Sequence, residues 1–161
     1  MHRVGRVHPD DVATTKARNS WIQYGTTKLA NLLFVAELSR RLEAGGFRTM
    51  ALAAHPGWTR SNLAGSGAAL GKSRVRRRLS RLAGANLGQS AAGGALPVLC
   101  AATSSHVHNG QYIGSGGAFA MFGPPRVSRP SRRARDPKLA ARLWEASEEL
   151  TGVRYSVAAS V

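Results

Sequence analysis

The sequence predicts an α/β fold, on three observations. Three segments have helical character, the strongest with apolar residues at three- and four-residue spacing. Two short apolar segments between them have the length of buried strands. The order helix, strand, helix, strand, helix is typical of helices packed on a parallel sheet. Because two strands make only a marginal sheet in water, the sequence looks like part of a larger domain.

The first predicted helix spans residues 22–44, and Gly45-Gly46 supplies its stop. Its apolar face comprises Leu29, Leu32, Leu33, Val35, Ala36, Leu38 and Leu42. The polar residues before it, broken by Pro9, predict a loop with one short helical turn. Residues 48–54 follow the helix; they are apolar and end at His55-Pro56-Gly57, which predicts a buried strand.

A second helix is predicted over residues 89–102, although glycines and a proline interrupt it. Close packing against a sheet would explain these small residues. Residues 111–113 predict a second strand, and residues 123–135, rich in proline and arginine, predict a basic irregular loop. The last helix is marked by Asp136 as N-cap, Pro137 at its first position and Gly152 at its end. Its apolar face carries Leu139, Leu143 and Leu150.

The charge balance is strongly basic, with 23 Lys and Arg against 8 Asp and Glu. The excess is concentrated in residues 72–81 and 126–135. Neither stretch interleaves aromatic residues with its arginines, so nucleic-acid binding is the least favoured interpretation. A solvated face or loop is favoured over a surface for an anionic ligand or membrane. The sequence has neither a bilayer-spanning apolar run nor the apolar region of a signal peptide, and we expect a cytoplasmic protein.

The single cysteine, Cys100, has no partner for an internal disulfide and lies in an apolar run, which favours a buried packing role. His106 and His108 lack a nearby third ligand, so no metal site is expected. His55 precedes the Pro-Gly turn and is expected to pack or cap there.

The most informative local feature is Tyr24-Gly25-Thr26-Thr27-Lys28 at the start of the first helix. Residues four apart share one helical face, so the ammonium group lies close to the phenol. A free tyrosine has a pKa of about 10, and a nearby cation or a helix N-terminus favours its phenolate. Such a pair can act as a general acid and base. The spacing alone, however, is common by chance.

The wider context resembles the short-chain dehydrogenase/reductase family, in the branch of retinol-dehydrogenase-like and protochlorophyllide-reductase-like enzymes. The resemblance rests on Tyr24-Gly-Thr-Thr-Lys28-Leu-Ala-Asn-Leu-Leu, the turn His55-Pro56-Gly57-Trp58-Thr59-Arg60-Ser61, the strand Gly110-Gln111-Tyr112-Ile113 and the last helix. It implies that residues 1–161 are the C-terminal, catalytic part of one domain with a partial Rossmann-like, doubly wound parallel sheet. The N-terminal βαβ nucleotide-binding half would be missing.

The same resemblance implies site roles. Tyr24 would exchange a proton with a small alcohol or carbonyl substrate, and Lys28 would assist it and bind the nicotinamide ribose. The cofactor, NADP or NAD, would also contact Pro56, Gly57, Trp58, Thr59 and Ser61. Residues 62–83 would form the substrate lid.

Two family features do not occur in this sequence: the glycine-rich phosphate loop and the serine-bearing strand ahead of the tyrosine. Ser20 is too close to Tyr24 to be that serine. We therefore expect a truncated chain that binds NAD(P)(H) weakly at best and whose own activity the sequence leaves open, with a homo-oligomer or a missing N-terminal half as its partner. The alternative is a non-catalytic α/β interaction module whose basic loops bind an anionic partner, or whose bare sheet edge pairs with another chain.

Overall fold

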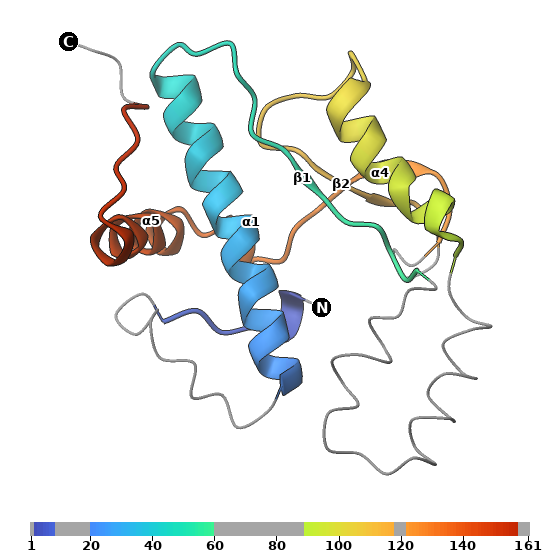
Figure 1. Ribbon diagram of the computed structural model, residues 1–161, viewed down its shortest axis with the longest axis horizontal. Helices are drawn as coiled ribbons and strands as arrows, with labels where there is room; N and C mark the ends of the chain where they lie inside the picture. Colours follow the sequence, from blue (N-terminus) through green and yellow to red (C-terminus); the bar gives the residue numbers. More distant parts are fainter. Residues whose placement is uncertain (1, 9–19, 60–88, 118–121, 158–161) are drawn as a thin grey trace. The chain divides into compact units, whose positions relative to one another are not determined.

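The computed structural model describes residues 2–8, 20–59, 89–117 and 122–157, and confirms the α/β class (Figure 1). The elements are η1 (His2–Val4), α1 (Ser20–Ala44), β1 (Ala53–Ala54), α4 (Ala91–Thr103), β2 (Tyr112–Ser115), β3 (Pro125–Ser128), η4 (Arg133–Arg135) and α5 (Pro137–Thr151). Ser61, the predicted lid at 62–83 and the basic stretch at 72–81 lie outside the described residues. None of the described helices has an apolar stretch sufficient to span a bilayer.

The chain divides into two compact units, which are described separately. The helical unit comprises Met1–Ala53, His108–Gln111 and Arg129–Val161. The sheet unit comprises Ala54–Val107 and Tyr112–Ser128.

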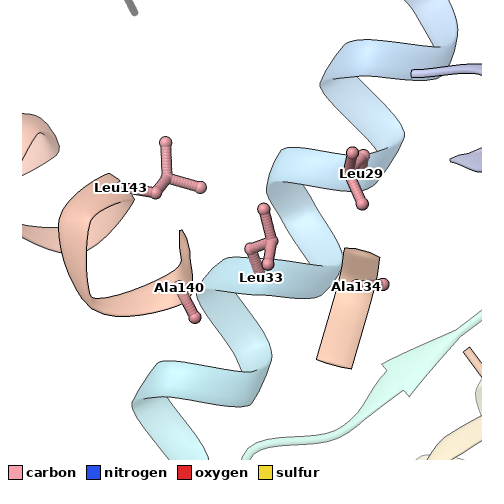
Figure 2. Packing of buried hydrophobic residues seen from close by; sticks show 5 residues of the cluster. All are labelled: Leu29, Leu33, Ala134, Ala140 and Leu143. Carbon is pink, nitrogen blue, oxygen red and sulfur yellow. The ribbon is translucent and has the colours of Figure 1, made fainter. Parts of the chain in front are cut away.

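The core of the helical unit forms where α1 meets α5 and η4. Leu29 and Leu33, four residues apart on α1, are both 0% exposed. They pack with Ala134 of η4 and with Ala140 and Leu143 of α5 (Figure 2). The predicted first helix is confirmed, although it begins two residues earlier, at Ser20, and ends at Ala44. Burial of this stripe stabilises α1 more than the helix propensities of its residues do.

Helix α5 has both predicted caps. The Asp136 carboxylate accepts hydrogen bonds from the backbone N–H groups of Lys138 (3.0 Å) and Leu139 (3.1 Å). At the other end Gly152 takes the left-handed conformation, with φ of 68°. Such a cap costs glycine no steric strain. The prediction for this helix is therefore confirmed at both ends.

One turn after Leu33, helix α1 carries a buried carboxylate. Glu37 is 1% exposed, and its oxygens accept hydrogen bonds from the Arg40 guanidinium (2.6 and 2.9 Å) and from Arg41 Nε (2.7 Å). The Arg41 guanidinium also lies 4.7 Å from the ring centre of Trp144 on α5. Burial pushes the pKa of Glu37 upward, but the hydrogen bonds and charges of Arg40 and Arg41 outweigh it, so the net pKa is lowered.

The sheet has the order β1-β2-β3 and is mixed. Strands β1 and β2 run parallel, since the N–H groups of Ala53 and His55 donate to the carbonyls of Gln111 and Ile113 (3.0 and 2.8 Å). Strand β3 runs antiparallel to β2, with Ile113 opposite Val127. The sequence analysis predicted a parallel sheet only, so the antiparallel β3 is a correction.

Two predicted segments differ from the structure. Residues 123–135 contain β3 and η4 rather than an irregular loop, because β2 offers hydrogen-bonding partners to a segment whose Pro125 sits at a strand start. The predicted strand 48–54 is reduced to Ala53–Ala54. Just before it, Ala51 N–H donates to the side chain of Asn109 (2.9 Å) instead of to a strand.

Helix α4 packs against β2 and β3. Gly94 and Pro97 are buried, but Gly94 faces the turn at Pro56 and Thr59 instead of a strand. Its N-cap is Ser90, whose hydroxyl accepts from Gly93 N–H (3.1 Å). Cys100 is partly buried and not fully buried as predicted.

The Glu37 cluster yields a stability prediction. Glu37→Gln removes the charge that pairs with Arg40 and Arg41, and we expect it to lower the free energy of unfolding by about 1–3 kcal/mol at neutral pH. Because the folded pKa of Glu37 is lowered, its contribution is present above the unfolded pKa and is lost as pH falls through the folded pKa. The difference between variant and wild type in urea melts should therefore shrink in acid. The exposed Glu43→Gln serves as control, and an equal effect of both changes would contradict the prediction.

Candidate active site

Tyr24 and Lys28 lie together on one side of α1. The Lys28 ammonium nitrogen is 5.2 Å from the centre of the Tyr24 ring, within the range of a cation–π contact. Tyr24 is half-buried and Lys28 is exposed. The predicted proximity of the two side chains is thus observed, with the ammonium free to contact a bound molecule.

The two threonines between Tyr24 and Lys28 use their hydroxyl groups in hydrogen bonds within α1. The hydroxyls of Thr26 and Thr27 donate to the carbonyls of Ile22 (2.9 Å) and Tyr24 (2.8 Å) in the preceding turn. Thr26 also accepts from Arg6 N–H at 3.1 Å. These bonds tie the N-terminal segment to the same turn of α1.

The helix dipole contributes less to this pair than the sequence argument supposed. Because α1 begins at Ser20, Tyr24 is the fifth helical residue and lies beyond the first turn. The positive field of a helix N-terminus falls off within that turn. Among the described residues of α1, Lys28 is the cation that contacts the Tyr24 ring.

The second group of predicted site residues forms a turn after β1, in the sheet unit. Gly57 has φ of 73°, a conformation that side-chain-bearing residues rarely adopt. Its N–H donates to His55 Nδ1 at 2.9 Å, which confirms that His55 caps the turn. Pro56 is exposed, whereas Trp58 and Thr59 are half-buried.

Gln89 also donates hydrogen bonds to this turn, a role that was not predicted from the sequence. Its side-chain amide donates to the Pro56 carbonyl and to the Ser115 hydroxyl (3.2 Å), and its backbone N–H donates to the Trp58 carbonyl (2.8 Å). Thr59 and Gln89 also form a parallel bridge. The partners of Gln89 lie 26 to 33 residues away, so no local pattern in the sequence reveals them.

Gly94 lets α4 approach the same turn. A methyl group on Gly94 would collide with the Thr59 side chain and lie 3.6 Å from Pro56 Cβ. The turn is therefore supported by the side chain and the backbone of Gln89 and by the surface of α4, all within the sheet unit.

Each group of predicted site residues is thus assembled within its own unit: Tyr24 with Lys28, and Pro56 to Thr59 with Gln89. His106 and His108 are exposed, as expected for surface histidines. Among the residues that the structure describes, no cluster of three or more His, Cys, Asp or Glu side chains could hold a metal ion.

Comparison with known proteins bears on what these groups do. No protein-family model matches the chain. Retinol dehydrogenase 12 of Homo sapiens is 32% identical over 155 residues, which is 96% of this chain and 44% of that protein. A short chain dehydrogenase/reductase of Macrophomina phaseolina is 32% identical over 126 residues, 78% of this chain and 57% of that protein.

The chain is related to the short-chain dehydrogenase/reductase family. It spans about half the length of the curated short-chain dehydrogenase/reductases that it matches. Retinol dehydrogenase 11 of Homo sapiens is 32% identical over 94% of this chain. The crystal structure of an uncharacterized protein from Mycobacterium paratuberculosis matches 96% of this chain and 48% of its own, with 34% identity and a TM-score of 0.67. The partial Rossmann-like fold is consistent with that match.

The support of the turn by α4 is testable with two adjacent glycines. Gly94→Ala drives a methyl group into Thr59, and we expect it to lower the free energy of unfolding by about 1–3 kcal/mol. Gly93→Ala meets only ordinary contacts, the nearest at 3.4 Å, and should be neutral or stabilise by up to about 1 kcal/mol. Urea melts of the two variants measure the difference. Equal effects would show that α4 does not pack closely on the turn.

Proposed function

We propose that the chain carries the proton-transfer site of an NAD(P)-dependent oxidoreductase that interconverts a small alcohol and a carbonyl compound. The observation that carries the proposal is the contact between Lys28 and Tyr24 in a chain related to short-chain dehydrogenase/reductases. Retinol dehydrogenases 11 and 12 are named for oxidation of an alcohol, which supports the substrate class.

Each of the two groups, taken by itself, has chemistry that suits the nicotinamide end of such a cofactor. The Lys28 ammonium is exposed and has three hydrogen-bond donors, which suit the hydroxyls of a ribose. The turn at Pro56–Thr59 offers backbone groups to a flat aromatic ring. The phosphate end is not matched, because the sequence contains no glycine-rich loop leading into a helix. We therefore expect weak binding of either dinucleotide to the isolated chain.

In this proposal the nicotinamide cofactor supplies or accepts the hydride. Tyr24 donates its phenolic proton to the oxygen of the carbonyl substrate in reduction and accepts it in oxidation. Lys28 stabilises the negative charge that remains on the phenol oxygen after the proton leaves.

Turnover by the full 161-residue chain tests the proposal. The assay follows NADPH absorbance with a panel of small aldehydes at millimolar cofactor, so that weak binding does not hide the reaction. Tyr24→Phe should lower the rate at least about 100-fold, because positioned proton transfer contributes about 10²–10⁴-fold. Tyr155→Phe, at an exposed tyrosine, is the matched control.

Two results would contradict the proposal: turnover that is unchanged in Tyr24→Phe, or no turnover under any condition tested. A dissociation constant for NADPH in the micromolar range would contradict only the expectation of weak binding.

A second candidate function is supported by the exposed arginines around η4 in the helical unit. Arg129, Arg132, Arg133 and Arg135 are all exposed, and none forms an ion pair with a carboxylate of the described residues. A non-catalytic module that binds an anionic partner would use this surface. Its retention on a heparin column would fall with salt and would not change in Tyr24→Phe.

A further inference from the structure

Gln89 uses both hydrogens of its side-chain amide within the sheet unit. One is donated to the Pro56 carbonyl and the other to the Ser115 hydroxyl. A carbonyl only accepts hydrogen bonds, so the amide nitrogen must face the turn and the amide oxygen must face away. That oxygen lies toward the first turn of α4, where a Cβ on Gly93 would be 3.4 Å from it.

The residues that carry the two acceptors differ in burial. Ser115 ends β2 and is 1% exposed, so it is part of the sheet's buried interior. Pro56 is exposed and lies in the turn. The Gln89 carboxamide therefore connects the buried Ser115 hydroxyl to the exposed Pro56 carbonyl. The backbone of Gln89 bonds to Trp58 and forms a bridge with Thr59.

We propose that Gln89 is a positioning residue: its carboxamide holds the Pro56–Thr59 turn on Ser115 in the shape that receives the nicotinamide. The functional part of this inference rests on the proposed function. Gln89 itself acts through the turn, because its two amide hydrogens are already occupied.

One substitution isolates this role with almost no change of shape. Gln89→Glu replaces the donating nitrogen with an oxygen, which in its ionised form can only accept and would face the Pro56 carbonyl. Protonation of the new carboxyl restores one donor, so the hydrogen bond to the turn should return in part as pH falls below about 4. A side chain that merely fills space would show no such pH dependence.

The chain also offers a matched control. Gln111 accepts a hydrogen bond from His108 N–H through its side-chain oxygen (3.1 Å). Gln111→Glu makes the same chemical change but retains an oxygen at the accepting position. It should leave the turn unaltered at every pH.

The experiment records the carbonyl ¹³C resonance of Pro56 by NMR in wild type, Gln89→Glu and Gln111→Glu between neutral and acidic pH. Loss of the hydrogen bond should shift this resonance upfield in Gln89→Glu at neutral pH only, with a return toward the wild-type position in acid. Ser115→Ala, which removes the buried anchor, should shift it in the same direction at all pH values. Wild-type and Gln111→Glu spectra at each pH show what acid alone changes. A Pro56 resonance that is identical in Gln89→Glu and wild type would overturn the inference.

A second arm adds NADPH and follows the resonances of the turn and of the Trp58 indole. If the Pro56 signal depends on Gln89 and NADPH moves the turn less in Gln89→Glu than in wild type, both proposals are supported. The other informative result is a Pro56 signal that depends on Gln89 while NADPH shifts no turn resonance in any variant. That result would support the positioning of the turn by Gln89 and contradict binding of the nicotinamide by the turn.

Discussion

The rotation of α1 about its own axis is set by the burial of Leu29 and Leu33. Both side chains lie on one face because they are four residues apart, and both are 0% exposed against α5 and η4. Lys28 precedes Leu29 by one residue, so its side chain points about 100° away from the core. Tyr24 shares the Lys28 face by its four-residue spacing. The hydrophobic stripe therefore keeps the candidate acid/base pair out of the buried core, with Lys28 exposed and Tyr24 half-buried.

The same face of α1 also carries a buried charged residue, Glu37. Glu37 follows Leu33 by four residues and is as fully enclosed as the leucines, which would be costly for an unpaired carboxylate. Its partners Arg40 and Arg41 come from the next turn, and Arg41 also covers Trp144. Trp144 in turn stacks on Phe34, with ring centres 5.2 Å apart. Aromatic, cationic and acidic groups thus extend the contact between α1 and α5 beyond the apolar core.

The turn after β1 is organised in a different way, by polar contacts to distant residues. His55 and Gly57 satisfy one hydrogen bond locally, but the carbonyls of Pro56 and Trp58 depend on Gln89. Such a turn keeps a defined shape without a hydrophobic core of its own. A turn held by several hydrogen bonds in this way needs little further ordering if it contacts a ligand.

The sequence by itself determined the features that depend on neighbours within about one helical turn. These are the caps of α5 at Asp136 and Gly152, the stop of α1, and the shared face of Tyr24 and Lys28. Tertiary structure decided the rest: that residues 125–128 pair with β2, that only two residues of the predicted strand 48–54 join the sheet, and that Gln89 meets Pro56 and Ser115. The physical reason is distance along the chain. A cap or an i, i+4 pair involves residues that are close in the sequence. A strand pairing or a bridging amide forms only after folding brings remote segments together.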